Sequence, residues 1–449
     1  MLSLLPVLML ASNPCGPLDL PTVLALVASR SDEVAIKQAD VLGAQADVAL
    51  ARALGVIPLA TATVLTGPAP GARGNIVSAP GFDNRNPFTR LGPFGRIDIN
   101  VIQPIFTFGQ ITDAREAAAA GVHARGLLVM DTLRQVQERV VQLYWGIVLA
   151  RRFLSIAADV EDALKQVDQK IQESLDKGTG DVIQADKFRV QVFRGDLLQK
   201  KADAQKALKL ARLALSGTLA LDEAALVLKE DVLPSALELT KASPAQVMGV
   251  ALQKRPDLRA LSDAITAREA LVRQKEAARL PTVFLVGTFT YAGSTNRDIQ
   301  HNPWVHDDFN QLSGGVGLGL RENLAFPTMN AELEKARAEL QGLRRQREGL
   351  SRLVRVEAES GVAELTAAED RFTAAHGSVM AGRGWFRSSG ISFNLGVTDA
   401  KALLEAYTGF VQTQVNESQS RFDVLLAKAH LDTLMGNVFP QGETQCTLP

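Results

Sequence analysis

The stretch TVLALVASRSDEVAIKQAD (residues 22–40) has a related stretch, QVMGVALQKRPDLRALSDA (residues 246–264), in the second half of the chain. Other marks recur at matching places after each copy. In the first copy these marks are Arg30-x-Asp32, Pro58, Gly178-Thr-Gly-Asp181 and Leu-Ser-Gly217. Their counterparts in the second copy are Arg255-x-Asp257, Pro281, Gly396-Val-Thr-Asp399 and Leu-Met-Gly436. A duplication with so long a period indicates a fold of two equivalent halves rather than a solenoid of small repeats.

Composition favours long helices. The chain has 449 residues, enough for two or three ordinary domains. Its 48 basic and 49 acidic residues nearly cancel, so no general attraction to nucleic acid is expected. Aromatic residues make up only 5% of the chain, while Ala, Leu, Gln, Glu, Lys and Arg are abundant. No uninterrupted apolar run is long enough for a transmembrane helix.

The two ends of the chain carry expectations of their own. Residues 1–18 form a signal-like segment with an apolar core and no preceding Lys or Arg, and we expect export. Residues 437–449 form a polar tail. The two cysteines are Cys15 and Cys446; a lipid on Cys15, a disulfide between them and two inert thiols all remain open.

The first repeat is expected to span residues 19–217. Helical spacing covers residues 19–54, and strands are predicted over about 57–67 and 95–106. In the first strand Leu59, Thr61, Thr63 and Leu65 alternate with small residues, and in the second Ile97, Ile99 and Val101 alternate with Asp98 and Asn100. A long helical hairpin follows over 110–216, with apolar residues at steps of three and four, as in a coiled coil. The seam residues are Leu133, Val136, Val140, Leu143 and Ile147, then Val190, Phe193, Leu197, Ala204, Leu208, Ala211 and Leu215.

After a linker or equatorial segment at 218–243, the second repeat repeats each step over residues 244–436. A helix leads to strands at about 281–292 and 312–324 and then to a helical hairpin at 328–436. Val283, Leu285, Phe289 and Tyr291 are predicted on one face of the first of these strands, and Leu312, Gly314, Val316, Leu318 and Leu320 on one face of the second.

The four strands pose a physical problem. They have one apolar and one polar or small face, and four such strands cannot close a barrel alone. Open edges invite aggregation in water and are not tolerated in a membrane. The sequence therefore predicts that several chains each contribute four strands to one closed outer-membrane barrel.

The ordered set of features resembles the TolC-type outer-membrane efflux family, over about residues 19–436. The motifs are the duplicated Arg-x-Asp, Gln103-Pro-Ile-Phe-Thr-Phe-Gly109 between strand and helix, and Phe393-Asn-Leu-Gly396 with Leu403-Leu-Glu-Ala406, which is similar to the family pattern F-x-x-G-x(6)-[VL]-L-[DE]-A. The resemblance implies a homotrimer with a twelve-stranded outer-membrane β-barrel on a periplasmic α-helical barrel. It also implies an exit duct for a tripartite efflux pump or type I secretion system, with a periplasmic adaptor protein and an inner-membrane transporter as partners.

The same resemblance places functional residues at the hairpin tips. The adaptor-docking turns would be Gly178, Thr179, Gly180 and Asp181, and Gly396, Val397, Thr398 and Asp399. Glu405 and Asp399 are candidates for an acidic ring at the pore gate, and Ala402 stands at a position where the resemblance implies a second acid. The plainer interpretation is that Asp399 and Asp181 cap helices and that Glu405 is a solvated helix residue.

Two departures from the family are visible. Arg321-Glu-Asn-Leu-Ala-Phe-Pro327 stands where the first copy has the Gln103–Gly109 motif, and three Tyr with three Trp are few for the aromatic girdles of a membrane barrel.

Other constellations point away from catalysis. His301, His306, Asp307 and Asp308 lack the regular spacing of metal ligands, and a solvated loop is the preferred interpretation. Gly315-x-Gly317-x-Gly319 lies within a strand and is interpreted as small residues at a crowded barrel position rather than a phosphate site. We expect no enzyme, no cofactor and no metal. The alternative function is a non-conducting periplasmic coiled-coil scaffold or adaptor, which has no need for membrane-length strands with an apolar face.

Overall fold

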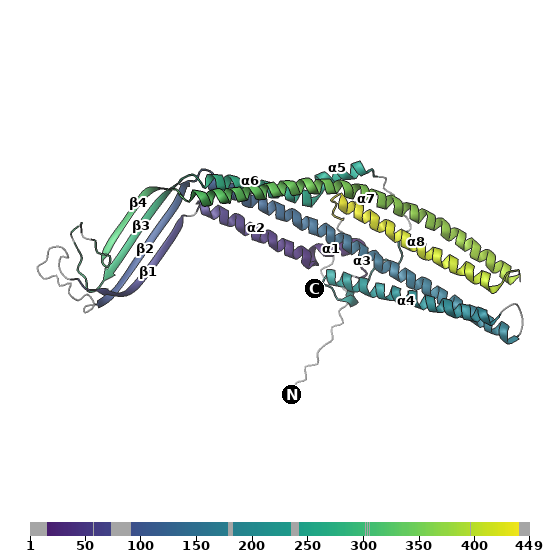
Figure 1. Ribbon diagram of the computed structural model, residues 1–449. Helices are drawn as coiled ribbons and strands as arrows, with labels where there is room; N and C mark the ends of the chain where they lie inside the picture. Colours follow the sequence, from purple (N-terminus) through teal and green to yellow (C-terminus); the bar gives the residue numbers. More distant parts are fainter. Residues whose placement is uncertain are drawn as a thin grey trace, which may run out of the picture. The chain divides into compact units, whose positions relative to one another are not determined.

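The computed structural model describes residues 16–56, 58–72, 91–177, 183–234, 242–300, 302, 304, 306–395 and 397–439. Its elements occur in the same order in the two halves of the chain (Figure 1). The first half contains α1 (Leu20–Arg30), α2 (Asp32–Val56), β1 (Leu59–Pro70), β2 (Leu91–Phe106), α3 (Gln110–Lys177) and α4 (Gln184–Thr218). After a 3-10 turn, η1 (Glu223–Ala225), the second contains α5 (Pro244–Lys254), α6 (Pro256–Ala277), β3 (Thr282–Ser294), β4 (Gln311–Arg321), α7 (Phe326–Asn394) and α8 (Ala400–Leu434).

The chain divides into two compact units. The sheet unit comprises Val41–Ala124 and Leu261–Gln346, and the helical unit comprises Met1–Asp40, Arg125–Ala260 and Arg347–Pro449. Each unit therefore draws on both halves of the sequence, because the long helices α3 and α7 contribute to both.

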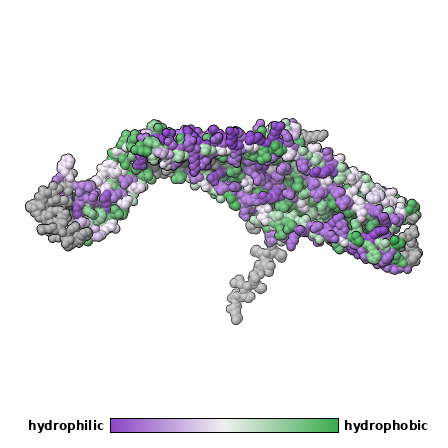
Figure 2. Space-filling model, viewed as in Figure 1, coloured by the Kyte–Doolittle hydropathy of each residue, from purple (hydrophilic) through white to green (hydrophobic). Residues whose placement is uncertain are grey.

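The sheet is antiparallel with strand order β1-β2-β3-β4 (Figure 1). β1 extends past Gly67-Pro68 to Pro70, and β2 begins at Leu91, earlier than the predicted residue 95. Proline is tolerated there because β1 has a neighbour on one side only, and a proline nitrogen at a free edge has no hydrogen bond to lose. Beside the sheet, α6 and α7 are joined by ion pairs, Lys275 with Glu332 at 2.7 Å and Arg337 with Glu276 at 2.8 Å. Figure 2 shows this surface as a hydrophilic band.

One sequence expectation was wrong: the helical spacing over 19–54 and from 244 onward does not form single helices. Each is broken at its Arg-x-Asp mark, at Ser31 between α1 and α2 and at Arg255 between α5 and α6, where the backbone is extended (ψ of 121° and 122°). In the second copy Pro256 is the cause, since a proline disfavours helical backbone in the residue before it. Periodicity alone does not reveal such a break, because the apolar positions continue on both sides.

The helical unit is built on two antiparallel hairpins, α3 with α4 and α7 with α8 (Figure 1). The predicted seam lies in its cores: Val136, Val140, Ile147, Val190 and Leu215 are all buried. One core joins α1, α3 and the end of α4, and a second joins α3, α4 and α8. A segment of α3 is long and apolar enough to cross a membrane, but 56% of it is buried within the protein, as expected of a core helix.

Candidate functional site

The sheet has one apolar face, which the strand register defines. Directly paired residues of neighbouring strands lie on the same face, and Ile99 pairs with Phe289, which pairs with Gly314. The apolar members of this face are Ala60, Ala62, Val64, Ile97, Ile99, Val101, Val283, Leu285, Phe289, Tyr291, Leu312, Val316, Leu318 and Leu320. Several are strongly exposed in the single chain, Val316 at 78% and Leu312 at 72%. A continuous exposed apolar face marks a surface for lipid or for another protein.

The opposite face is mixed, with its polar residues gathered in one part. The polar members there are Thr61, Thr63, Arg96, Asp98, Asn100, Thr288, Thr290, Gln311 and Ser313, and the same face also carries Ile102, Phe284 and Val286. Arg96 donates to both carboxylate oxygens of Asp98 at 2.7 and 2.9 Å, and the Thr290 hydroxyl donates to Asp98 at 2.8 Å. The predicted faces of β2, β3 and β4 are confirmed. In β1, however, Leu59 and Leu65 lie on the polar face, opposite Ile102 and Arg96.

Both outer strands of the sheet have a free edge within the described chain. β1 pairs only with β2, and β4 pairs only with β3. An edge of 11 or 12 residues with unpaired N–H and C=O groups is a template for another strand. The sheet is therefore amphipathic, with an unpaired edge on each side within the described chain.

The glycines of β4 differ in how closely other atoms approach them. A Cβ at Gly319 would lie 2.6 Å from the Phe284 ring, so the crowding predicted from the sequence is confirmed there. Gly315 has no atom within 4 Å of such a Cβ. Crowding within the chain does not explain that position.

The loop between β3 and β4 is held to the end of β1 by a buried ion pair. Arg297 contacts Asp307 at 2.9 Å and donates to the carbonyl oxygen of Pro70 at 2.6 Å. The neighbouring pair, His306 and Asp308 at 2.9 Å, is exposed, and His301 lies outside the described residues. The prediction of a solvated loop is therefore wrong for Asp307, which is buried because Arg297 binds it. No metal-binding cluster of His, Cys, Asp or Glu occurs among the described residues.

At the hairpin tips the structure describes part of the predicted docking turns. Gly178, Thr179, Gly180, Asp181 and Gly396 lie outside the described residues, whereas Val397, Thr398 and Asp399 lie within them. Asp399 is the N-cap of α8, and its carboxylate accepts a hydrogen bond from the Ala402 backbone N–H at 2.8 Å. The capping interpretation of Asp399 is therefore confirmed.

Glu405 lies one turn further along α8 and is exposed. Its carboxylate is 3.8 Å from the ammonium group of Lys401, one turn before it. Sequence reasoning missed this cation, although an i,i+4 spacing on a helix is a readable signal. The positive charge of Lys401 therefore opposes any electrostatic role of Glu405.

The second Arg-x-Asp mark forms a buried charge cluster. Arg255 donates to both carboxylate oxygens of Asp257, at 3.1 and 2.7 Å, and is paired with Glu357 of α7. Burial alone lowers the pKa of Arg255, but its hydrogen bonds to these two carboxylates outweigh burial and raise it above its usual range. Burial raises the pKa of Asp257, and the hydrogen bonds and charge of Arg255 bring it below its ordinary value. The cluster ties the α5–α6 junction to α7.

Arg134 of α3 extends this cluster. It contacts Asp131 at 2.6 Å and Asp257 at 3.8 Å and donates to the carbonyl oxygen of Thr433 at 2.9 Å. Close by, His430 of α8 contacts Glu138 of α3 at 2.6 Å. No sequence pattern indicates these partners, because they lie far apart along the chain.

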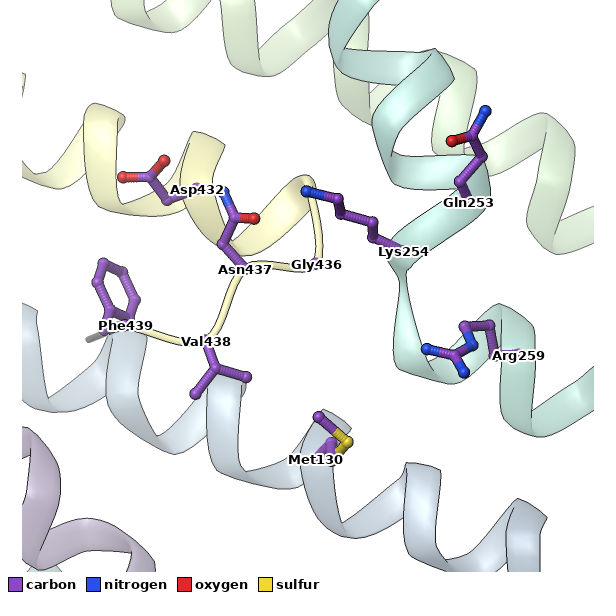
Figure 3. Close-up of a pocket in the computed structure, with 9 residues that line it drawn as sticks. All are labelled: Met130, Gln253, Lys254, Arg259, Asp432, Gly436, Asn437, Val438 and Phe439. Carbon is purple, nitrogen blue, oxygen red and sulfur yellow. The ribbon is translucent and has the colours of Figure 1, made fainter. Parts of the chain in front are cut away.

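Gly436 lies next to the α5–α6 junction. Figure 3 shows Gly436 and Asn437, just past α8, beside Lys254 at the end of α5, with Arg259 of α6 and Met130 of α3 around a cavity of about 550 Å³. The φ of Gly436 is +78°, a conformation that favours glycine. Two marks of the second copy, Arg-x-Asp and Leu-x-Gly, thus meet in space.

Comparison with known proteins gives a family match and several structural likenesses. Residues 247–437 match the family described as outer membrane efflux protein. No curated protein sequence matches the chain.

Solved structures of similar fold include bacterial outer-membrane proteins. The Campylobacter jejuni outer membrane channel CmeC has a TM-score of 0.76 at 14% identity, over 94% of this chain and 87% of that one. The Vibrio cholerae outer membrane protein VceC has a TM-score of 0.74 at 14% identity, over 93% and 96%. The open state of the Neisseria gonorrhoeae MtrE outer membrane channel has a TM-score of 0.73 at 16% identity, over 94% and 90%. At such identities these likenesses establish the fold.

Proposed function

We propose that this chain is a member of the outer membrane efflux protein family, whose model matches residues 247–437, and that it is the outer-membrane exit duct of a tripartite efflux pump or type I secretion system. Solutes pass through it passively, across the periplasm and the outer membrane. The observation that carries the proposal is the sheet, which has an exposed apolar face, a polar face and two free edges. These properties suit a barrel wall between lipid and a water-filled lumen.

The proposed assembly is a homotrimer with a twelve-stranded barrel. A β1 edge of one chain would pair with a β4 edge of the next, which removes every free edge when the ring closes. The strands have 11 to 16 residues, and about 9 to 11 tilted residues suffice to cross the hydrocarbon core. The long helices would continue into the periplasm as a helical barrel.

The proposed partners are a periplasmic adaptor protein and an inner-membrane transporter. The adaptor would dock at the tip turns, Gly178–Asp181 and Gly396–Asp399. Opening would be a change in helix packing at these tips rather than a chemical step. Glu405 is the proposed gate residue, with Asp399 as a second candidate that already caps α8.

A non-conducting coiled-coil scaffold is the less favoured function. Such a protein needs hairpins like α3/α4 and α7/α8, but it has no use for a sheet whose most exposed side chains include Leu312, Val316 and Leu318. The sheet therefore distinguishes the two functions.

The deciding experiment is extraction of the full chain from outer membranes in detergent, followed by sizing and planar-bilayer recording. We expect a detergent-stable trimer that conducts, and no conductance from the same fraction of cells that do not make the chain. A water-soluble monomer without conductance would contradict the proposal.

A further inference from the structure

A cavity of about 530 Å³ lies in the helical unit between α3 and the α7/α8 hairpin, near the hairpin tips. It does not include the charge cluster at Arg255, and it shares only Leu404 with the groove between α4 and α8 that contains Glu405. Its volume falls in the range of roughly 300–1,000 Å³ that is typical of small-molecule sites.

The walls of the cavity are aromatic and aliphatic. Phe386 and Phe393 of α7 and Tyr407 of α8 contribute the rings, and the Phe386 and Tyr407 centroids are 5.1 Å apart. On the α3 side the wall is Leu164 and Ile171, which belong to the core that joins α3 and α4. A flat apolar molecule would find ring faces on one side and aliphatic side chains on the other.

Small residues keep this space open. A Cβ added at Gly390 would contact only the Leu403 side chain, at 3.9 Å. Further along the hairpin, α7 and α8 pack closely, since a Cβ at Gly409 would lie 2.5 Å from the Trp385 ring and one at Gly382 would lie 3.0 Å from the Thr413 hydroxyl. Protein interiors leave few voids larger than a water molecule. An apolar space of this size beside a tightly packed hairpin is therefore suited to an occupant.

The polar groups of the cavity narrow the class of occupant. The Tyr407 hydroxyl makes no hydrogen bond to another described residue, and burial, aided by the charge of Asp159, raises its pKa, so it remains protonated. It can donate to an acceptor. The charged lining residues Lys170 and Glu173 have opposite signs and favour neither an anion nor a cation.

We propose that this cavity binds a neutral, planar aromatic molecule that carries a hydrogen-bond acceptor for Tyr407. Such a molecule would contact α3, α7 and α8 together and hold the two hairpins in their present packing. If the chain is the duct proposed above, an occupied cavity opposes opening of the tips. That consequence rests on the proposed function, whereas the site itself does not.

Photolabelling with benzophenone tests the site. Benzophenone is a neutral aromatic ketone that attaches to nearby C–H groups under ultraviolet light. The full-length protein in lipid nanodiscs would be labelled and its peptides mapped by mass spectrometry. We expect labels on α3, α7 and α8 around Ile171, Phe386 and Leu403, saturating with concentration. Labels there no denser than on the exposed tip residues Phe188 and Val192 of α4 would overturn the proposal.

Two glycine variants provide a matched comparison. Gly390→Leu fills the cavity, while Gly384→Leu, in the same helix and with no atom within 4 Å of its Cβ position, points into open space. Both replace a helical glycine by a good helix former, so neither should impair folding. Labelling should fall at least tenfold in Gly390→Leu and stay unchanged in Gly384→Leu. Equal labelling of the two variants would also overturn the proposal.

Two further measurements separate the parts of the proposal. Tyr407→Phe removes the donor and should weaken labelling about fivefold, the effect of one hydrogen bond; unchanged labelling would refute the role of Tyr407. In planar bilayers, benzophenone should lower the open probability of the unmodified protein and not that of Gly390→Leu. A conducting protein that is labelled but does not respond would refute the effect on opening alone. Absence of any conductance would instead count against the duct.

Discussion

Gly436 lies directly against the backbone of Arg255. A Cβ at position 436 would be 2.9 Å from both the nitrogen and the Cα of Arg255, and the φ of Gly436 is +78°. The equivalent glycine of the first copy, Gly217, lies inside α4 with no atom within 4 Å of its Cβ position. Two glycines at matching positions of the two copies therefore have different structural surroundings: only Gly436 needs the absence of a side chain.

We predict opposite effects of alanine at these glycines. Gly436→Ala should destabilise the helical unit by at least about 1–2 kcal/mol from the left-handed backbone, with the contact to Arg255 adding to this. Gly217→Ala should stabilise by up to about 1 kcal/mol, because alanine is the better helix former. Thermal unfolding followed by circular dichroism gives the sign of each shift. A loss of the same size in both variants would contradict the packing at Gly436.

Removal of Arg255 should be costly. Arg255→Met leaves Asp257 and Glu357 without their buried partner, for which the expected loss is about 3–5 kcal/mol. Arg355→Met is the control, since its ion pair with Glu359 is exposed and such pairs contribute about 0–1 kcal/mol. Urea unfolding of both variants measures the difference. Equal midpoints would show that the cluster adds no stability.

Acidification should weaken the same cluster. Because the folded-state pKa of Asp257 is below its ordinary 3.8, its contribution is present above that pH and is lost as pH falls through the lower, folded value. The unmodified protein should therefore lose more stability than Arg255→Met as pH falls from about 4 to 2, which unfolding at fixed temperature can measure. Parallel losses in the two proteins would refute this coupling.

His430 should make stability depend on pH near neutrality. The hydrogen bond to Glu138 raises the pKa of His430; burial opposes this, Glu357 adds to it, and Arg134 also opposes it. The stabilisation is full below the ordinary pKa of 6.5 and is lost as pH rises through the folded value. His430→Gln should flatten the melting temperature between pH 6 and pH 8.5, while His123→Gln on the surface of α3 should keep the slope. An unchanged slope in His430→Gln is the contrary result.

Charge on the two faces of β4 should have unequal effects. Val316→Lys places an ammonium group on the apolar face, at a cost of about 2–4 kcal/mol near the bilayer midplane. Gly315→Lys carries the same charge on the neighbouring residue of the polar face and has open space for its side chain. Trimer yield from outer membranes should fall in Val316→Lys only. Equal yields would contradict the assignment of the faces.

Block by polyvalent cations tests Glu405. Glu405→Ala should weaken the block, since three carboxylates would be removed from the proposed ring, and Lys401→Ala should strengthen it by freeing Glu405 from its neighbour. Planar-bilayer titration with a trivalent cation from the periplasmic side compares the two. Unchanged block in Glu405→Ala removes this residue from the gate.

Much of the local structure followed from the sequence. The alternation of Ile97, Ile99 and Val101 with Asp98 and Asn100 predicted the two faces of β2 correctly. Successive side chains of a strand point to opposite faces, so the polarity of each residue indicates its face. The N-cap at Asp399 was predicted in the same way, since a cap is a contact between a side chain and the backbone three residues on.

The charge cluster could not be predicted. Arg134, Arg255, Glu357 and Thr433 come from four distant segments, and nothing in the local sequence selects among the many acidic residues that could face Arg255. These residues come into contact only because of how α3, α6, α7 and α8 pack. The partnership of His430 with Glu138 has the same origin.

The amphipathic strands, the coiled-coil seams and the duplication are readable in the sequence, because periodicity and capping act over a few residues. Three features required the folded chain: the helix break at Ser31, the approach of Gly436 to Arg255, and the position of Leu59 and Leu65 on the polar face of the sheet. The physical reason is that register and helix packing are fixed by partners far away in the chain. A residue's own neighbours in sequence do not carry that information.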